Sequence, residues 1–271
     1  MAGDNGSDSF EAMGNTGRDC TMGIFPHGYE HILHRSEYSD RWRRINQLTL
    51  RVAEKQINMT MKIVILDFDG TMGDTAAVIV QTMQATIREL GLPARTDEQC
   101  ASMIGLRLVE IPPVLFPECE LDGEFYAATY RRLFKIYDIE GAVKLYPNVL
   151  ETLVELKNRG YILTIASSRS RKTLVKYVED LGLSEHISYI LGADDVVNGK
   201  PDPEPVNRTL EKYGFDAQDA IVVGDTEYDI LMGKNAGTYT CGVTYGNGSR
   251  ESLKDADWII DDFGKLLEII K

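Results

Sequence analysis

Apolar residues from residue 61 onward follow two alternating patterns. Short, nearly continuous apolar runs predict buried strands at 62–66, 161–166, 187–191, 220–223, 238–243 and 258–260. Between these runs, apolar residues recur every three to four positions, which predicts helices at 147–159, 171–181, 204–213, 229–236 and 263–270. Strands that alternate with helices indicate a parallel sheet covered on both faces, so the expected fold class is α/β.

The residues at the predicted helix ends agree with this assignment. Gly160, Gly182 and Gly214 each follow the last periodic position of a helix, where glycine ends helices readily. Pro147 is suited to the first helical position of the helix at 147–159. We therefore expect these helices to end at their glycines.

The stretch 74–143 breaks the alternation. It contains helical patterns at 75–90, 96–103, 106–115 and 124–137 but no convincing strand. A connection between a strand and the next element is usually only a few residues longer than its helix. We therefore predict an all-helical cap at 74–143, inserted into an α/β core formed by 61–73 and 144–271, with Asp74 as the N-cap of the first cap helix.

Residues 1–60 differ from the rest of the chain. The segment 1–21 is rich in Gly, Ser, Asn and Asp, so we expect a largely disordered extension, with a short helix possible at 38–56. Its composition fits neither a secretory signal nor a mitochondrial presequence. His27, His31 and His34 have the spacing of one helix face, but Pro26 and Gly28 interrupt the helix and no Asp or Cys ligand is well placed. We favour a polar stretch over a metal site there.

Composition excludes several classes of protein. The 271 residues include 42 Asp and Glu against 29 Lys and Arg, a net charge of −13, so the chain has no general attraction for nucleic acid or anionic membranes. No apolar run approaches the ~18 residues of a membrane span. The cysteines are scattered without a CxxC pair, which argues against a disulfide scaffold or a zinc site and favours a reducing, cytoplasmic location.

Polar residues follow three of the predicted strands. The strand at 62–66 leads into Asp67-Phe68-Asp69-Gly70-Thr71, the strand at 161–166 into Ser167-Ser168-Arg169, and the strand at 220–223 into Gly224-Asp225-Thr226-Glu227-Tyr228-Asp229. The carboxyl ends of parallel strands line the ligand crevice of an open sheet. We therefore expect the carboxylates of Asp67, Asp69, Asp225 and Asp229 to converge there, together with the Ser167 hydroxyl.

Four carboxylates in one crevice repel one another unless a cation is present. Hard carboxylate oxygens at a site open to water and phosphate suit Mg²⁺. Lys200 supplies a positive side chain, and Pro201 and Pro203 stiffen its loop. Two aspartates at one strand end, a hydroxyl, a lysine and two further aspartates match phosphoryl transfer to a carboxylate nucleophile.

These four motifs, in this order, resemble those of the haloacid dehalogenase superfamily, and the resemblance covers 61–271. It implies a Rossmann-like core with a helical cap. It also implies that Asp67 is the nucleophile, that Asp69 is the general acid and base, and that Ser167 and Lys200 bind phosphate. Asp67, the Asp69 carbonyl and Asp225 would be the Mg²⁺ ligands, with Asp229 supporting them directly or through water.

Other interpretations remain open at several positions. Gly70 and Thr71 are further phosphate-binding candidates or simply a turn, and Ser168 competes with Ser167. Asp229 is also well placed to cap its own helix. Arg169 is interpreted as a charge that lies behind the site or in solvent.

The resemblance also separates activities within the superfamily. In related dehalogenases and phosphonate hydrolases the residue equivalent to Asp69 is replaced, and the latter use a cap lysine that the helix at 75–90 lacks. Sugar phosphomutases of the β-phosphoglucomutase type use a cap histidine, and 74–143 contains none. Ile104-Gly105-Leu106 and Cys241-Gly242-Val243-Thr244-Tyr245-Gly246 are similar to segments of phosphoglycolate phosphatases and their pyrophosphatase relatives. Arg107 would then be a candidate clamp for a substrate carboxylate.

The expected function is that of a Mg²⁺-dependent phosphatase that hydrolyses a small phosphorylated metabolite through an aspartyl-phosphate on Asp67, most like a phosphoglycolate phosphatase. A sugar phosphomutase, a pyrophosphatase and a binding protein of weak activity are the alternatives. The expected assembly is a monomer or a homodimer.

Overall fold

The computed structural model describes residues 61–271. The expectations for residues 1–60, namely the disorder, the helix at 38–56 and the polar stretch around His27, lie outside the described residues. Within 61–271, no helix combines the length and the apolar character needed to cross a bilayer.

A six-stranded sheet forms the centre of the fold, in the order β5-β4-β1-β6-β7-β8. Its strands are β1 (Ile63–Leu66), β4 (Ile162–Ala166), β5 (Tyr189–Leu191), β6 (Ala220–Gly224), β7 (Tyr239–Val243) and β8 (Trp258–Ile260). Every pairing in this sheet is parallel, and β1 lies between β4 and β6. The six apolar runs of the sequence therefore form one parallel sheet, with β1 and β6 side by side.

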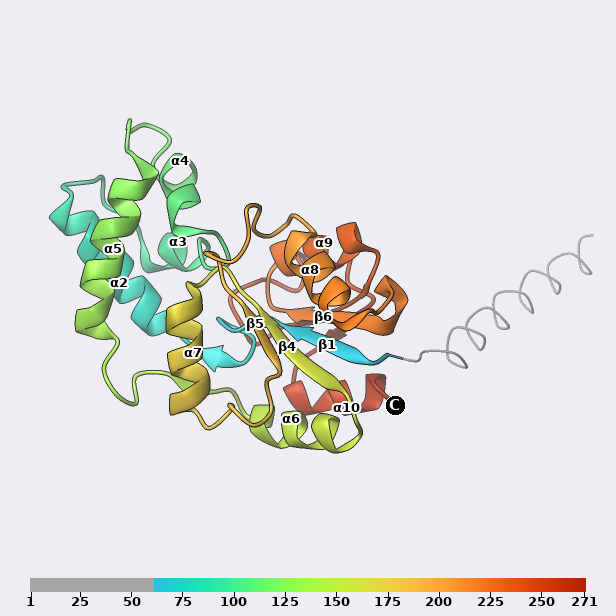
Figure 1. Ribbon diagram of the computed structural model, residues 1–271. Helices are drawn as coiled ribbons and strands as arrows, with labels where there is room; N and C mark the ends of the chain where they lie inside the picture. Colours follow the sequence, from blue (N-terminus) through green and yellow to red (C-terminus); the bar gives the residue numbers. More distant parts are fainter. Residues whose placement is uncertain (1–60) are drawn as a thin grey trace, which may run out of the picture. The chain divides into compact units, whose positions relative to one another are not determined.

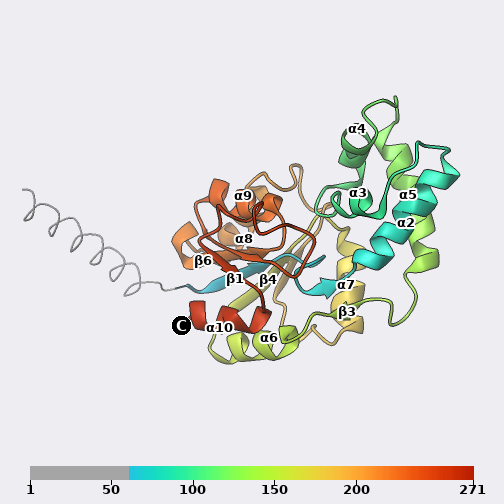
Figure 2. The same ribbon diagram turned by 180° about the vertical axis from the view of Figure 1, so that it is seen from behind.

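Helices cover both faces of the sheet (Figures 1 and 2). They are α6 (Val149–Asn158), α7 (Arg171–Asp180), α8 (Glu204–Tyr213), α9 (Glu227–Ala236) and α10 (Leu266–Ile269), the last preceded by a 3-10 turn at Phe263–Lys265. Alternate residues of β1 point to opposite faces. Val64 and Leu66 pack with α6, α7 and α10, whereas Ile63 and Ile65 pack with α8 and α9. Full burial of one such side chain stabilises the fold by about 1.5–3 kcal/mol. The α/β class with helices on both faces is confirmed.

Most predicted helix ends agree with the structure. Helix α8 spans the predicted residues, and Gly160, Gly182 and Gly214 all have positive φ just after a helix. The prediction that Pro147 is the first helical residue is wrong, because α6 begins at Val149. Asn148 is the N-cap, with φ of 63°, and its side-chain amide donates to Asp262 Oδ2 at 2.7 Å, so the chain turns before α6 begins.

The remaining helices lie together near the carboxyl ends of the strands, on the left in Figure 1 and on the right in Figure 2. They are α2 (Ala76–Glu89), α3 (Asp97–Ala101), a 3-10 turn at Leu108–Glu110, α4 (Ile111–Leu115) and α5 (Gly123–Tyr137). We call residues 76–137 the helical segment. Its helices correspond to the four predicted patterns; that 74–143 is a separate cap domain stays a prediction.

Two very short strands flank the helical segment. β2 (Gly73–Asp74) pairs antiparallel with β3 (Lys144–Leu145), so the chain leaves and re-enters the core at neighbouring points. The expectation that Asp74 caps the first helix is wrong. Asp74 pairs with Lys144 in the small sheet, and Thr75 is the N-cap of α2.

Candidate active site

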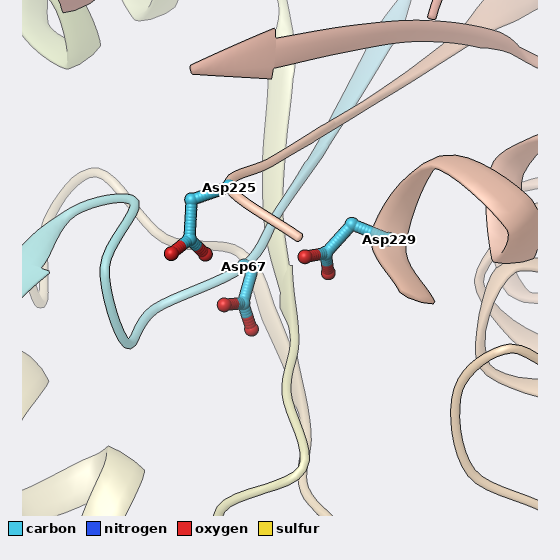
Figure 3. Close-up of side chains that lie close together, drawn as sticks. All are labelled: Asp67, Asp225 and Asp229. Atoms are coloured by element: carbon cyan, nitrogen blue, oxygen red, sulfur yellow. The ribbon is translucent and has the colours of Figure 1, made fainter. Parts of the chain in front are cut away.

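Three buried aspartates meet at the carboxyl end of the sheet. Asp67 follows β1, Asp225 follows β6 and Asp229 lies in the first turn of α9. Each offers one carboxylate oxygen within 4.8 Å of the others, and Figure 3 shows the three side chains converging. The three come together because β1 and β6 are neighbours in register, and because α9 begins directly after β6.

Lys200 connects two members of this cluster. Its Nζ lies 2.5 Å from Asp67 Oδ1 and 2.5 Å from Asp229 Oδ1, and its side chain is only 2% exposed. Burial lowers the pKa of Lys200, but the Asp229 and Asp67 carboxylates outweigh that effect and raise the pKa above its ordinary value. Lys200 therefore remains a buried ammonium ion, although a lysine on a loop is usually solvated.

The cluster as a whole carries excess negative charge. When all are ionised, three carboxylates against one ammonium leave two negative charges without a partner among these four groups. Burial, followed by repulsion from Asp229, raises the pKa of Asp225 to about 7. Burial also raises the pKa of Asp67 well above its ordinary value, despite the opposing effect of Lys200. An all-oxygen donor set with two uncompensated charges fits a divalent cation such as Mg²⁺.

Asp225 is held by residues on two loops. Its Oδ1 accepts a hydrogen bond from Thr71 Oγ1 at 3.2 Å, and its Oδ2 accepts from the Asn247 backbone N at 2.6 Å and Nδ2 at 3.0 Å. Gly70 lies against the same carboxylate with φ of 82°, and a Cβ there would overlap Asp225 and Asn247. The Gly70-Thr71 turn therefore shapes the carboxylate cluster, and its phosphate-binding role stays a prediction.

Asp229 caps its own helix, which is one of the two roles considered from the sequence, and its role towards Mg²⁺ stays a prediction. Its Oδ2 accepts hydrogen bonds from the Thr226 backbone N at 3.1 Å and Thr226 Oγ1 at 2.7 Å, which completes a capping box at the start of α9. Its Oδ1 accepts from Lys200. Helix capping thus fixes the carboxylate that faces Lys200.

The two serines after β4 have different partners. Ser168 Oγ donates to the Gly105 carbonyl oxygen in the helical segment at 2.6 Å. Ser167 is 8% exposed, and its Oγ accepts only a long bond, of 3.3 Å, from the Arg169 backbone N. The Ser167 hydroxyl proton therefore has no acceptor among the described residues, which supports the preference for Ser167 over Ser168 as a phosphate ligand.

Arg169 forms an ion pair that the sequence did not predict. Its Nε donates to both Asp69 oxygens, at 3.1 and 2.9 Å, and its Nη2 donates to Asp69 Oδ1 at 2.7 Å. The Arg169 side chain is 9% exposed, so it is not a solvent charge. One sequence feature could have pointed to this ion pair: a basic residue directly follows the predicted phosphate-binding serines, in a crevice expected to contain four aspartates.

Arg107 joins the helical segment to the loop after β5. Its Nη1 donates to the Val197 carbonyl oxygen at 2.9 Å, and its Nη2 donates to that of Ala193 at 3.5 Å. Both terminal nitrogens thus have protein partners, so binding a substrate carboxylate would require new contacts. The predicted clamp role of Arg107 stays a prediction.

A cavity of about 740 Å³ lies between these groups and the helical segment. Asp67, Asp69, Ser167 and Arg169 line it from the core, while Tyr130 and other residues of the helical segment line the opposite wall. Its volume is within the range of small-molecule sites. Asp67 therefore faces a space in which a small substrate can bind.

Comparisons with known proteins agree with this arrangement. A family model described as haloacid dehalogenase-like hydrolase matches residues 64–243. A phosphoglycolate phosphatase of Vibrio cholerae is 33% identical over 229 residues, covering 78% of this chain and 97% of the relative. The pyrophosphatase PpaX of Oceanobacillus iheyensis is 30% identical over 214 residues, covering 78% and 98%. The crystal structure of a predicted phosphoglycolate phosphatase from Haemophilus somnus superimposes with a TM-score of 0.70 and 27% identity, covering 78% of this chain and 99% of that one.

Proposed function

The chain belongs to the haloacid dehalogenase-like hydrolase family, and we propose that it is a Mg²⁺-dependent phosphatase whose nucleophile is Asp67. The observation that carries this proposal is the position of Asp67. Its carboxylate lies within the aspartate cluster, contacts Lys200 and lines the cavity. An oxygen nucleophile next to a cation site and an ammonium group is suited to attack on phosphorus.

The proposed reaction has two steps. An Asp67 carboxylate oxygen attacks phosphorus, the bond from phosphorus to the substrate oxygen breaks, and Asp69 gives its proton to the departing alcohol. Asp69 then takes a proton from water, the water oxygen attacks the phosphorus of the aspartyl-phosphate, and the bond from phosphorus to the Asp67 oxygen breaks, which releases inorganic phosphate. Asp69 acts as the acid in the first step and as the base in the second, so each cycle restores Asp67 and Asp69.

Other groups offset the negative charge of the phosphate. The Ser167 hydroxyl and the Lys200 ammonium group donate hydrogen bonds to phosphate oxygens. Asp67, Asp225 and the Asp69 carbonyl would hold Mg²⁺, with Asp229 as a direct or water-mediated support. The ion, when bound, supplies positive charge that reduces the repulsion between the substrate and Asp67.

The proposed substrate is a small phosphomonoester of the phosphoglycolate type. The absence of a histidine between residues 74 and 143 supports hydrolysis over a phosphomutase cycle. A pyrophosphatase is the second candidate, because one of the relatives carries that name.

Phosphate release by the full chain tests this proposal. Phosphoglycolate, pyrophosphate and β-glucose 1-phosphate are compared with Mg²⁺ and with EDTA, and activity is expected only with Mg²⁺. Asp67→Asn should abolish release, whereas Asp219→Asn, which removes a carboxylate paired with Lys62 at 3.0 Å outside the cavity, should not. No release with Mg²⁺, or full activity of Asp67→Asn, contradicts the proposal. Isomerisation of the sugar phosphate without release would favour the mutase.

A further inference from the structure

Arg169 and Asp69 meet edge to edge. Nε and Nη2, on one side of the guanidinium, make all three hydrogen bonds to the carboxylate. Paired hydrogen bonds between a guanidinium and a carboxylate fix orientation as well as distance. The plane of the Asp69 carboxylate is therefore set by Arg169.

Arg169 is itself held in place by two aromatic rings. Its Cζ lies 5.1 Å from the ring centroid of Phe134 on α5 and 5.1 Å from that of Tyr177 on α7. Tyr177 in turn stacks on Phe68, the residue between the two aspartates, with a centroid distance of 5.4 Å. Contacts from both the helical segment and the core thus restrict rotation of the guanidinium.

The two oxygens of Asp69 are not equivalent. Oδ1 accepts hydrogen bonds from both Nε and Nη2, whereas Oδ2 accepts only from Nε among the described residues. Oδ2 consequently keeps more free lone-pair capacity than Oδ1 for a group in the cavity. Asp69 lines the cavity together with Asp67, so the orientation of its carboxylate bears on any group bound there.

We propose that Arg169 is a positioning residue for the proton transfers of this enzyme: it acts through Asp69, by orienting its Oδ2, and not by binding the phosphate. This inference rests on the proposed function. A buried ion pair contributes little net stability, because desolvation offsets the attraction between its charges. Its location beside the nucleophile, with three hydrogen bonds to one carboxylate, accords with a role in orientation.

The test depends on the leaving group. An alkoxide needs a proton from Asp69 as it departs, whereas p-nitrophenolate is a weak base and leaves without one. Arg169→Met should therefore lower kcat/KM for an alkyl phosphomonoester by about 100-fold, the scale of a misplaced catalytic group. The value for p-nitrophenyl phosphate should change by less than about threefold, because kcat/KM reports only the steps up to departure of the first product.

A second readout concerns the water step. Asp69 must also take a proton from water, so Arg169→Met should slow breakdown of the aspartyl-phosphate. With p-nitrophenyl phosphate, the variant should release a burst of p-nitrophenol equal to the enzyme concentration, followed by a slow steady state. A change in folding alone would produce no such burst.

Arg95→Met is the matched control. Arg95 is also a largely buried arginine, 15% exposed, with an ion pair to Glu118 and a Cζ 4.8 Å from the ring centroid of Phe116. It does not line the cavity. Arg95→Met should change kcat/KM by the same factor for both substrates. Arg169→Lys, which keeps the charge but not the paired geometry, should fall between wild type and Arg169→Met for the alkyl ester.

The double variant with Asp69→Asn completes the test. If Arg169 acts through Asp69, adding Arg169→Met to Asp69→Asn should lower kcat/KM for the alkyl ester by less than about threefold. Equal losses on both substrates, a change confined to KM, or additive effects in the double variant would overturn the inference while leaving the phosphatase proposal intact. If the wild-type chain released no phosphate from any ester, the proposed function and this inference would both fall.

Discussion

Lys200 Nζ lies 2.5 Å from Asp67 Oδ1 although 133 positions separate the two residues in the chain. Both side chains are at most 5% exposed. Lys200 therefore offsets the negative charge beside Asp67 and is suited to bind the oxygens of a phosphate there. Removing the ammonium group should therefore affect stability and activity together.

Lys200→Met is expected to abolish most activity and to destabilise the fold. Loss of one partner from a buried ion pair costs about 3–5 kcal/mol, because the remaining charge is left buried and unpaired. Lys62→Met is the control, since Lys62 pairs with Asp219 but is 49% exposed, and such a pair contributes less than about 1 kcal/mol. Chemical denaturation with EDTA present measures both changes. Equal costs for the two variants would contradict the importance of burial.

Metal binding should stabilise the fold more at pH 7.5 than at pH 5. The pKa of Asp225 is about 7 in the folded chain, against an ordinary value of 3.8 in the unfolded chain. Between these two pH values the folded state holds a proton on Asp225 that the unfolded state has lost. The stability contributed by that proton is fully present below pH 3.8 and is lost as the pH rises towards about 7. A divalent cation replaces that proton, so its benefit is largest where the proton has been lost.

The measurement is the shift in Tm between saturating Mg²⁺ and EDTA, recorded at both pH values. Asp225→Asn serves as the control, because it removes both the titrating group and a proposed Mg²⁺ ligand. In that variant the Mg²⁺ shift should be small at either pH. A wild-type shift that is the same at pH 5 and pH 7.5 would show that the carboxylate cluster does not couple protons to the cation.

Gly70→Ala should weaken the carboxylate cluster. Gly70 has φ of 82°, and an added Cβ would overlap the Asp225 carboxylate and the Asn247 amide. Gly160→Ala is a matched control, because Gly160 has φ of 89° but open space around the added atom. Gly160→Ala should lower the free energy of unfolding by about 1–2 kcal/mol, because alanine is strained in the left-handed backbone conformation. Gly70→Ala should cost more and should also raise the Mg²⁺ concentration needed for half-maximal stabilisation; equal costs and unchanged Mg²⁺ affinity would contradict this.

The sequence predicts the parts of the fold in which local pattern and burial agree. Strands such as Ile63–Leu66 are fully buried in a parallel sheet, so their apolar runs are visible without any tertiary information. The rule that strand ends share one edge then places Asp67 near Asp225. The two-residue strands β2 and β3 leave no periodic signal, which explains why Asp74 was misassigned as a helix cap.

Contacts between distant polar residues were not predictable in the same way. Arg169 and Asp69 are 100 positions apart, and nothing in either local pattern specifies their pairing. Asn247 lies in an irregular loop, and only its hydrogen bonds to Asp225 reveal its position beside the cluster. Such contacts depend on how loops from different strands meet, which periodicity does not encode.

Arg107→Ala should impair all substrates to a similar degree. Its guanidinium donates to the Val197 and Ala193 carbonyl oxygens, and thereby ties the helical segment to the core beside the cavity. Without these bonds the helical segment is less well held over the site, so kcat/KM should fall for phosphoglycolate and for a phosphomonoester without a carboxylate alike. Arg131→Ala, on α5, is the control, because Arg131 also lines the cavity but its one ion pair within residues 61–271 is a 3.7 Å contact with the exposed Glu124. If Arg107→Ala instead impaired phosphoglycolate alone, through an increase in KM, the guanidinium would exchange its carbonyl partners for the substrate carboxylate and act as the clamp expected from the sequence.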